Sequence, residues 1–462
     1  MASSSSGTGK LSRELGFWSC LAIMLGNIIG AGIFLTPAEV AAASPNVATY
    51  LTLWALGGLM AASGAHVFAE LGMLFPQAGG DYVFLDKAYG RSVARAWGLL
   101  AAFGTFPGSL AALAVGITAT IAQTDMGAFL LVPIFSTDFF TLTTGDLFGI
   151  ALIGLSMTVN LLGLSWTSAL QMLLSLVPVG LFTIFAVAAI FGWHLDAADL
   201  VQRDSSSWDA KGLAAAGCAV FFTYSGWNVL TYIGGEIKEP HKTIPRVIFT
   251  GVTFTTVIYI VLNLAFITVM PLDELKNQQN AGVAVAAAQL GDAGAKAFSI
   301  LLSMALLAGL NATMMAGARI AFAMGQDKLL WRQMRLVSPV RKTPVTAIWT
   351  QGIIASLLVL TGSFSFLLTW TGSILILLSC ITASTIFVFR HKRRMEMPVK
   401  MKGYPWTAII FLSVGLGIWV IGLVQSWKLF LVPLVIFVAL SLIPYKDPNN
   451  SNKAATGSDT RP

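Results

Sequence analysis

Charged residues are scarce in this sequence. Asp, Glu, Lys and Arg together make up 11% of its 462 residues, against roughly 25% in a soluble domain. Apolar residues make up 56%, and apolar runs recur along the whole chain. This composition excludes an array of soluble domains and predicts one polytopic membrane protein of the all-α class. The net charge of +7 requires no nucleic-acid partner, because membrane proteins concentrate Lys and Arg in their cytoplasmic loops.

Cysteine and histidine are scarce too. The three cysteines, Cys20, Cys218 and Cys380, fall in separate apolar runs and offer neither a disulfide framework nor metal-ligand spacing. The four histidines also stand in four separate segments: His66, His194, His241 and His391. The sequence therefore contains no nucleophile–base or metal constellation of an enzyme, and we expect no metal and no cofactor. An ion channel would need a ring of charges or a carbonyl filter, and neither is evident.

Twelve apolar stretches are long enough to cross a bilayer. They lie at residues 14–43, 47–74, 93–122, 145–163, 166–192, 211–236, 245–270, 294–325, 344–361, 364–390, 405–426 and 428–444. An even number of spans puts both termini on one side, and most Lys and Arg then fall on that side. The positive-inside rule therefore predicts a multi-pass protein of the cell membrane with both termini in the cytoplasm. We interpret the basic cluster at residues 390–394 as a topology determinant, with binding of anionic lipid or a partner as the alternative.

The first apolar stretch contains three glycines within seven residues: Gly26, Gly30 and Gly32. Each glycine weakens a helix by about 1 kcal/mol relative to alanine, and open backbone at this depth is tolerated only where it lines a cavity or is buried in protein. A spanning helix that is interrupted halfway is typical of secondary transporters. One alternative is close helix packing through the small-xxx-small spacing of Gly26 and Gly30. Another is a capping box at residues 36–39, which would start the outer half-helix at Thr36.

The sixth stretch carries a similar interruption, with polar residues and glycine at residues 223–228 and two more glycines at 234–235. Stretches one and six each begin a group of five, and interrupted helices at matching positions indicate an inverted repeat. No convincing residue-level similarity joins the two halves, so this prediction depends on position alone. We expect a disordered cytoplasmic segment at 1–13, five-helix repeats at 14–192 and 211–390, two additional transmembrane helices at 405–444, and a disordered cytoplasmic tail at 445–462.

Two interrupted helices that cross at mid-membrane depth can bind a zwitterion through backbone groups alone. The start of an outer half-helix presents free N–H groups and a positive dipole end, which suit a carboxylate. The end of an inner half-helix presents free carbonyls, which suit an ammonium group. Glycine at the break lets a ligand approach the backbone closely. This chemistry predicts an L-α-amino acid as the ligand and requires no charged side chain in the pocket.

Five segments carry a specific resemblance. Residues 26–34 resemble a G-x-I-I-G-[SA]-G-I-F first helix, residues 222–228 an F-A-Y-x-G-W-N sixth helix, and residues 236–245 the E-x-x-x-P-x-x-x-[LI]-P segment that follows it. Residues 107–113 are similar to a P-x-S-x-A-A-L pattern, and residues 309–313 to G-L-N-A-[ST]. Together, in the order in which they occur along the chain, they resemble the amino acid–polyamine–organocation superfamily, and within it the L-type amino acid transporter family. The resemblance implies a five-plus-five inverted-repeat core of the LeuT type with two extra C-terminal helices, about twelve transmembrane helices in all.

The resemblance also implies how the ligand would be held. The N–H groups of Ala31 and Gly32 would bind the substrate carboxylate. The carbonyl of Ile28, with those of Phe222 and Ser225, would bind the substrate ammonium group.

The same resemblance implies a second role for Phe222 and completes the site. The ring of Phe222 would close over the substrate as a gate, and Asn228 would support the broken region. Gly30 and Gly226, the glycines at the two breaks, complete the predicted substrate-binding residues. Ser225 stands where many family members have glycine, which adds a hydroxyl and reduces the room in the pocket.

The fifth helix departs from the family pattern. Many sodium-independent relatives carry a lysine there, whose ammonium stands in for a sodium ion. In this chain the corresponding position is Ser175 or Pro178, depending on the alignment, and no lysine occurs in residues 160–208. The coupling element of that subgroup is therefore absent.

Three charged residues in or near the spans have several interpretations. Arg319 is an intramembrane charge and hence a functional candidate, but its place near the cytoplasmic end of a span favours snorkelling to the interface. Glu236, beside Lys238 and Arg246, is predicted to form a gate or structural ion pair, with proton transport as the alternative. Glu39, expected near the outer end of the first span, receives no role.

We expect an amino acid carrier, not an enzyme, that moves neutral L-amino acids by alternating access through sodium-independent exchange or facilitated flux. A proton-coupled symporter is the alternative mechanism, and a transporter-like amino acid sensor is the alternative function. Relatives joined to a heavy chain use a cysteine in the outward loop after the third span. Residues 123–144 contain no cysteine, so we predict no disulfide-linked accessory subunit.

Overall fold

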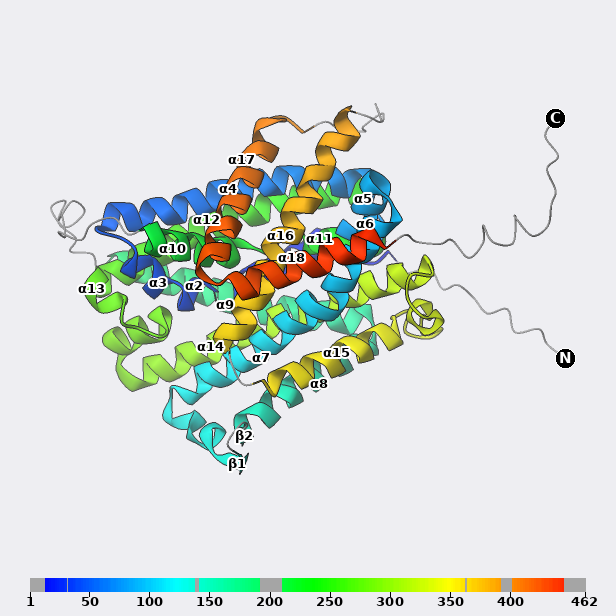
Figure 1. Cartoon of the computed structure of the whole chain (residues 1–462). Helices are drawn as coiled ribbons and strands as arrows, with labels where there is room; N and C mark the ends of the chain where they lie inside the picture. The colour runs from blue at the N-terminus through cyan, green and yellow to red at the C-terminus, as the bar shows by residue number, and fades with distance from the viewer. Residues whose placement is uncertain are drawn as a thin grey trace, which may run out of the picture.

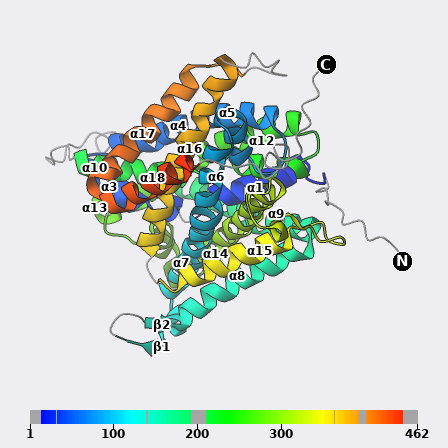
Figure 2. The same ribbon diagram turned by 45° about the vertical axis from the view of Figure 1, so that its right-hand side comes forward.

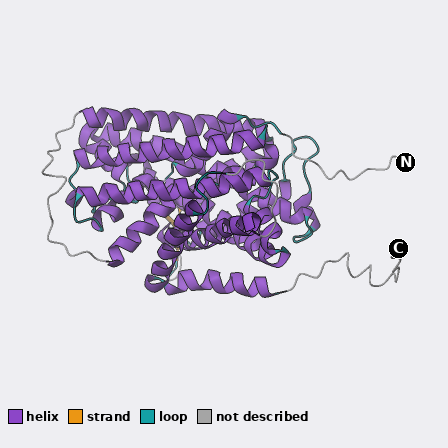
Figure 3. Cartoon of the chain, turned by 90° about the horizontal axis from the view of Figure 1, so that it is seen from above, coloured by secondary structure: helices purple, strands orange, loops and turns teal. Residues whose placement is uncertain are grey.

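The computed structural model describes residues 13–30, 32–137, 141–191, 210–361, 364–391 and 401–443, and most of this part of the chain is helical (Figure 3). In chain order the elements are α1 (Phe17–Ile28), α2 (Gly32–Leu35), α3 (Pro37–Ala42), α4 (Val47–Leu74), α5 (Asp81–Tyr89), α6 (Arg91–Leu100), the π-helical turn η1 (Ala101–Thr105), α7 (Phe106–Ala122), the 3₁₀ helix η2 (Asp125–Leu131), β1 (Pro133–Ser136), β2 (Thr141–Thr143), α8 (Thr144–Leu162), α9 (Leu164–Phe191), α10 (Ala210–Tyr224), α11 (Val229–Tyr232), the 3₁₀ helix η3 (Gly234–Glu236), α12 (Pro240–Val269), α13 (Leu272–Leu275), α14 (Ala281–Gln326), the 3₁₀ helix η4 (Arg332–Arg335), α15 (Val345–Val359), α16 (Phe364–His391), α17 (Trp406–Gln425) and α18 (Trp427–Leu442). Most long helices run side by side, whereas α16 and α17 cross them at an angle (Figures 1 and 2).

The apolar helices agree with the twelve predicted spans. Within the described residues, nine helical segments are long and apolar enough to cross a membrane, and three shorter apolar helices occupy the remaining predicted positions. The main difference lies in α14, which begins at Ala281 instead of residue 294. Gly291 has a φ of 65°, so the helix bends there and continues from a preceding helical segment. The protein is therefore a polytopic all-α membrane protein.

The predicted interruption in the first span is present. Helix α1 ends at Ile28, Ile29 leaves the helical region with φ −82° and ψ 88°, and α2 begins at Gly32. The alternative start at Thr36 through a capping box is wrong. Thr36 has helical φ and ψ and makes no side-chain cap; its N–H donates to the Gly32 carbonyl over 2.9 Å and its hydroxyl to the same carbonyl over 2.8 Å. The outer half of this span therefore starts at Gly32, and the helical backbone of Thr36 joins α2 to α3.

The sixth span is interrupted as well. Helix α10 ends at Tyr224, residues 225–228 are not helical, and α11 resumes at Val229. Gly226 has a φ of +109°, a conformation that only glycine adopts without strain. The chain thus depends on this glycine to turn sharply at the break.

The first and last described segments are fixed at the same end of the bundle. Leu15 pairs with Ile237 in a short parallel bridge, and Arg95 donates to the carbonyls of Leu440 and Ile443 over 3.2 and 2.7 Å. Figure 1 shows α18 ending on the side where α5 lies. This arrangement agrees with an even number of spans.

Arg390, the first residue of the basic cluster, has a defined structural role. Its guanidinium binds the buried Glu70 carboxylate over 2.7 and 2.6 Å, donates to the Met401 carbonyl over 3.2 Å and lies 4.6 Å from the centre of the Tyr404 ring. Arg390 therefore ties α4, α16 and the segment before α17 together. Residues 392–394 lie outside the described part of the chain.

Candidate functional site

The two interrupted helices open onto one cavity of about 120 Å³. Its lining consists of residues from the two breaks and from η1, α7, α14 and α16: Asn27, Ile28, Gly30, Gly32, Thr105, Phe106, Ser109, Ala112, Leu113, Phe222, Thr223, Ser225, Gly226, Asn228, Val229, Tyr232, Thr313, Ala316, Thr371 and Leu375. Seven of the eight predicted site residues lie in this wall: Ile28, Gly30, Gly32, Phe222, Ser225, Gly226 and Asn228. The eighth, Ala31, lies outside the described residues. None of the described lining residues carries a charged side chain.

Gly32 lies in close contact with the sixth span. A Cβ at this position would lie 2.8 Å from Thr223 Oγ1 and 2.9 Å from Thr223 Cα. The two threonines on either side of the contact also bind each other, since the hydroxyls of Thr36 and Thr223 are 3.0 Å apart. Glycine therefore brings the start of the outer half-helix against the backbone of α10.

The carbonyls at the C-terminal ends of α1 and α10 have different partners. The Tyr259 hydroxyl donates to the Ile28 carbonyl over 2.9 Å and to the Thr223 carbonyl over 3.2 Å. The Phe222 carbonyl accepts from both the N–H and the hydroxyl of Ser225, over 3.0 and 2.6 Å. Both lone pairs of the Phe222 carbonyl are thus engaged inside the protein, so the Ile28 and Ser225 carbonyls suit an ammonium group better.

The two breaks are joined through Asn27. Its Nδ2 donates to the Gly226 carbonyl over 3.1 Å, and its Oδ1 accepts from the Thr313 hydroxyl over 3.2 Å. A Cβ at Gly226 would lie 2.7 Å from Asn27 Nδ2. The left-handed turn at Gly226 and the amide of Asn27 therefore form one unit, which also reaches α14.

An uncharged polar cluster surrounds Ser175 in α9, one of the two positions that the resemblance aligns with the fifth-helix lysine. Gln171 donates to the Ser175 hydroxyl over 2.9 Å and accepts from Asn311 Nδ2 over 2.7 Å. Asn160 Nδ2 donates to Asn311 Oδ1 over 2.8 Å. A Cβ on Gly26 would collide with Ser175 Oγ and Gln171 Nε2, so the cluster lies against α1. All four side chains are at least 98% buried.

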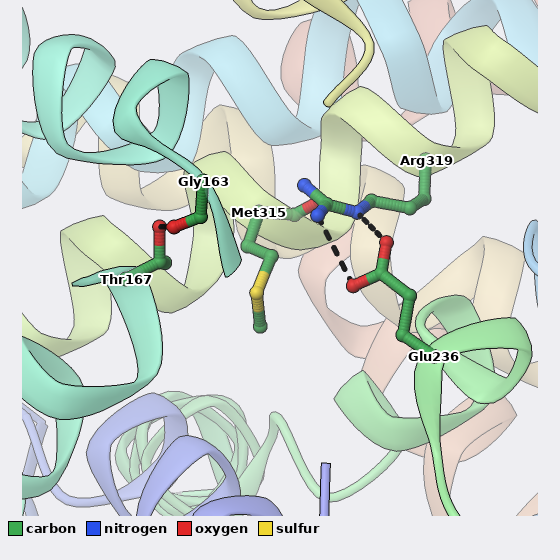
Figure 4. Close-up of polar contacts among 5 residues, drawn as sticks. All are labelled: Gly163, Thr167, Glu236, Met315 and Arg319. Atoms are coloured by element: carbon green, nitrogen blue, oxygen red, sulfur yellow. Dashed lines mark hydrogen bonds and ion pairs between the residues drawn. The ribbon is translucent and has the colours of Figure 1, made fainter. Parts of the chain in front are cut away.

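Arg319 and Glu236 form a buried ion pair (Figure 4). Arg319 Nε and Nη2 donate to Glu236 Oε1 and Oε2 over 2.9 and 3.1 Å, and Nη1 donates to the Met315 carbonyl over 3.1 Å. Both side chains are 2% exposed, so the predicted snorkelling of Arg319 is wrong. Figure 4 also shows Thr167, whose hydroxyl donates to the Gly163 carbonyl over 2.9 Å.

The structural ion pair predicted for Glu236 is present, but its partner is not one of the charged residues beside it in sequence. Lys238 and Arg246 are close to Glu236 in sequence, but its carboxylate binds Arg319, 83 residues away. A bidentate pair with additional hydrogen bonds compensates the loss of hydration of both charges. Glu39, the third charged candidate, is exposed on α3 and takes no part in the cavity.

A buried carboxylate that the sequence reasoning did not select lies behind the cavity. The Tyr232 hydroxyl donates to Asp81 Oδ2 over 3.0 Å, and Asn228 Nδ2 donates to the Tyr232 hydroxyl over 2.8 Å. Asp81 is 1% exposed, and among the described residues its Oδ1 has no partner. Burial raises the pKa of the Asp81 carboxyl to about 7, although hydrogen bonds to the carboxylate lower it.

The charged side chains on the elements around Asp81 are engaged with other groups. Glu236 and Arg319 bind each other, Arg390 binds Glu70, Arg95 binds two carbonyls, Asp327 accepts from the Tyr82 hydroxyl over 2.7 Å, and Arg91 donates to the Asp327 carbonyl over 3.5 Å. Lys87 is exposed on α5, and Asp86 is half-buried. This environment therefore favours the neutral form of Asp81 near and below pH 7.

Several cavity residues were not predicted from the sequence. Thr105, Phe106, Thr371 and Leu375 come from parts of the chain without a transporter-type break, and Tyr232 ends α11, the short helix after the break in the sixth span. Trp227, which lies within the sixth-helix motif, packs against Phe68 and Phe411 instead of lining the cavity. Only a polar residue inside an apolar span, such as Thr105, offers a signal that could have been used.

The comparisons with known proteins all find amino acid transporters. The model of a family described as amino acid permease matches residues 15–440. The chain is 27% identical over 448 residues to the b(0,+)-type amino acid transporter 1 of Rattus norvegicus, covering 95% of this chain and 88% of that protein. It is 27% identical over 452 residues to the large neutral amino acids transporter small subunit 2 of Mus musculus, covering 96% and 81%.

A solved structure is similar in fold. The crystal structure of MhsT in complex with L-phenylalanine matches with a TM-score of 0.62 and 16% sequence identity, covering 91% of this chain and 100% of that one. At this identity the likeness supports the fold alone.

Proposed function

Because this chain belongs to the amino acid permease family, we propose that it exchanges neutral L-amino acids across the cell membrane by alternating access. The chain is a multi-pass amino acid transporter and not an enzyme. The proposal adds the substrate class, the mode of transport and the orientation, with both termini in the cytoplasm. It also includes the domain organisation predicted from the sequence, with five-helix repeats at residues 14–192 and 211–390 and two additional helices at 405–444.

One observation carries the proposal: the ends of two broken helices meet at a cavity whose described wall has no charged side chain. An α-amino acid presents one carboxylate and one ammonium group, and free backbone groups at the breaks complement both. A cationic or anionic side chain on the substrate would be buried without a counter-charge, which is unfavourable. Neutral amino acids therefore fit best.

The substrate groups are assigned to backbone atoms. The N–H groups of Ala31 and Gly32 would bind the carboxylate, because the helix that begins at Gly32 continues through Thr36 into α3 and its positive end faces the break. The Ile28 and Ser225 carbonyls would bind the ammonium group. The Phe222 carbonyl would contribute less, because it already accepts two hydrogen bonds from Ser225. Asn228 would hold the break in shape through Tyr232.

The uncharged cluster around Gln171 supports sodium independence. Asn311 and Thr313 are the oxygen-bearing side chains that a sodium site near the first break would use, and both bind other side chains. A hard cation such as sodium requires several oxygen ligands at one place. The cluster offers amides and a hydroxyl that bind one another, although Asn160 Oδ1 has no partner among the described residues. It contains no charged group beside α1.

We expect counterflow in proteoliposomes to reveal exchange. Unlabelled neutral amino acid inside should accelerate the uptake of labelled substrate several-fold, whereas a sodium gradient or acid outside should change uptake little. Uptake against a concentration gradient that is driven by either ion and needs no internal substrate would replace this proposal with the symporter. Absence of uptake together with substrate binding would favour the sensor.

Proton-coupled transport through Glu236 is the weaker alternative. The Glu236 carboxylate makes two hydrogen bonds to Arg319, and protonation would leave a buried guanidinium without its counter-charge. We propose instead that the ion pair holds η3 against α14 and so keeps the inner end of the cavity closed.

The proposed gate residue lies in the cavity wall. The half-buried ring of Phe222 lines the cavity and faces Gly372 of α16, where an added Cβ would lie 3.9 Å from it. Phe222→Ala should lower the transport rate at least tenfold at similar expression, because closure over the substrate completes the site. Phe221→Leu, a conservative change at a buried neighbour outside the wall, is the comparison for packing. Unchanged transport kinetics in Phe222→Ala would make Phe222 a packing residue.

Asp81 is expected to make exchange depend on pH. Its carboxyl lies at the contact between residues 78–82 and the α11–η3 segment, where the Gly79 N–H donates to the Tyr232 carbonyl over 3.0 Å. If the inner end opens there, Asp81 becomes hydrated and its pKa falls from about 7 towards the usual value of about 3.9. Protonation therefore stabilises the closed arrangement, and this stabilisation is lost as the pH rises through 7.

The pH effect has a direct measurement. With equal pH on both sides, exchange limited by inner opening should slow by up to about tenfold from pH 8 to pH 6, because one proton is bound per closed molecule. Asp81→Asn keeps an acceptor for Tyr232 and should be slow and independent of pH in this range. Asp327→Asn, the other tyrosine-bound carboxylate, should retain the wild-type profile. A pH profile that persists in Asp81→Asn would assign the effect to another group.

The three cysteines support a chain without a disulfide-linked subunit. Cys20 and Cys380 are buried, and Cys218 is half-buried with its thiol towards the Ile418 carbonyl. None lies in residues 123–144. A reducible heterodimer in native membranes would contradict this part of the proposal.

A further inference from the structure

Thr105 ends a π-helical turn at the edge of the cavity. Residues 101–105 form η1, and the Phe106 N–H donates to the Ala101 carbonyl five residues back. Pro107 follows at once and cannot donate to the carbonyl four residues before it, which favours a change of hydrogen-bond register just ahead of it. Such single π turns inside α-helices are rare and occur frequently at functional sites.

The π turn changes the bonding of the Thr105 hydroxyl. Threonines elsewhere in these helices donate to the carbonyl four residues back, as Thr118, Thr120 and Thr371 do over 3.1, 2.8 and 2.6 Å. For Thr105 that carbonyl belongs to Ala101 and receives the Phe106 N–H instead. Among the described residues the Thr105 hydroxyl has no partner, although the side chain is only 5% exposed. A buried hydroxyl without a partner is unfavourable and requires an explanation.

The position of Thr105 suggests what its partner is. It lines the cavity together with Phe106 and Ser109 of the following helix and with Leu375 of α16. The broken helices form the other part of the wall and, in the proposed function, bind the carboxylate and ammonium groups. The part that contains Thr105 is thus left for the substrate side chain.

We propose that the Thr105 hydroxyl forms a hydrogen bond with a hydroxyl on the substrate side chain, so that the transporter selects serine and threonine over alanine and valine. This inference rests on the proposed function of the cavity. A hydroxyl both donates and accepts, so one Thr105 partner suffices for a side-chain hydroxyl, whereas a side-chain amide would bring four hydrogen-bonding positions into a wall that is otherwise largely apolar. The neighbouring Phe106, Ala112, Leu113 and Leu375 suit the carbon atoms of a short side chain.

The test compares isosteric substrates on the purified, reconstituted protein. In the wild type, L-threonine should compete with labelled substrate about tenfold better than L-valine, and L-serine better than L-alanine, because the apolar analogues leave the hydroxyl unpaired. In Thr105→Val the threonine-to-valine ratio should fall to about one, through weaker threonine binding and unchanged or stronger valine binding. Thr120→Val, which removes a buried hydroxyl that already has a partner in α7, should keep the wild-type ratio.

The outcomes test the role of Thr105 and the proposed function of the protein separately. If the wild type binds neutral amino acids without preferring threonine over valine, or if Thr105→Val keeps the preference, the role of Thr105 is overturned and the proposed function stands. If the wild type binds no neutral amino acid, the proposed function itself fails. Should Thr105→Val not fold, Thr105→Ser must keep the preference and Thr105→Ala must lose it for the inference to hold.

Discussion

Replacement of Gly32 by valine is expected to weaken amino acid binding at least about 100-fold. Even a single Cβ at this position would lie 2.9 Å from the Thr223 backbone, and backbone atoms of a packed helix cannot move aside as a flexible side chain can. The start of the outer half-helix would therefore move away from α10. The N–H groups at the break would then no longer face the carboxylate, and the branched side chain would restrict the local backbone further.

Binding of labelled amino acid to the purified variant measures this effect, with gel filtration as the check on folding. Gly154→Val is the matched control, because a Cβ at Gly154 in α8 meets nothing within 4 Å; it should bind substrate like the wild type. Normal affinity in a folded Gly32→Val protein would remove the carboxylate from this end of the first break.

The second large effect is expected at the buried ion pair. Arg319→Ala leaves the Glu236 carboxylate buried without a partner, and breaking such a pair destabilises a protein by about 3–5 kcal/mol. The closed inner end should therefore be lost, and the melting temperature of the purified protein should fall. A cysteine placed at Val229, a cavity residue that is 1% exposed, should react faster with a thiol reagent in the Arg319→Ala background than in the wild type.

The double variant Glu236→Gln/Arg319→Met provides the comparison. Removing both charges avoids an unpaired buried ion, so most of the lost stability should return. A double variant as unstable as Arg319→Ala would show that the side-chain shapes matter more than the charge pairing. A wild-type melting temperature in Arg319→Ala would contradict the role of the pair altogether.

The spans and their breaks were predictable because their causes are local. A run of apolar residues reports burial in lipid directly, and glycines at mid-span, such as Gly26, Gly30 and Gly32, mark where the helix cannot continue. The start of α14 was not, because the bend at Gly291 joins a segment of mixed polarity to the span. The capping pattern at Thr36 was misleading because the preceding residues are already helical.

The candidate site was predictable only along the two breaks. Seven of its predicted residues line one cavity, since the breaks themselves expose backbone. Thr105 and Tyr232 could not be found in this way, because their position depends on how separate helices pack. The same holds for Arg319, whose partner Glu236 lies 83 residues away; sequence neighbours such as Lys238 gave the wrong partner.

The hydroxyl of Tyr259 has a consequence for movement within the bundle. It lies within 2.9 Å of the Ile28 carbonyl and 3.2 Å of the Thr223 carbonyl, yet it carries a single proton and donates one strong hydrogen bond at a time. When the first span shifts relative to the sixth, the proton can stay with whichever carbonyl remains near, and the number of hydrogen bonds does not change. The Tyr259 hydroxyl can therefore stay hydrogen-bonded to one broken helix while the other moves away, so that relative movement of the two helices costs no hydrogen bond of Tyr259.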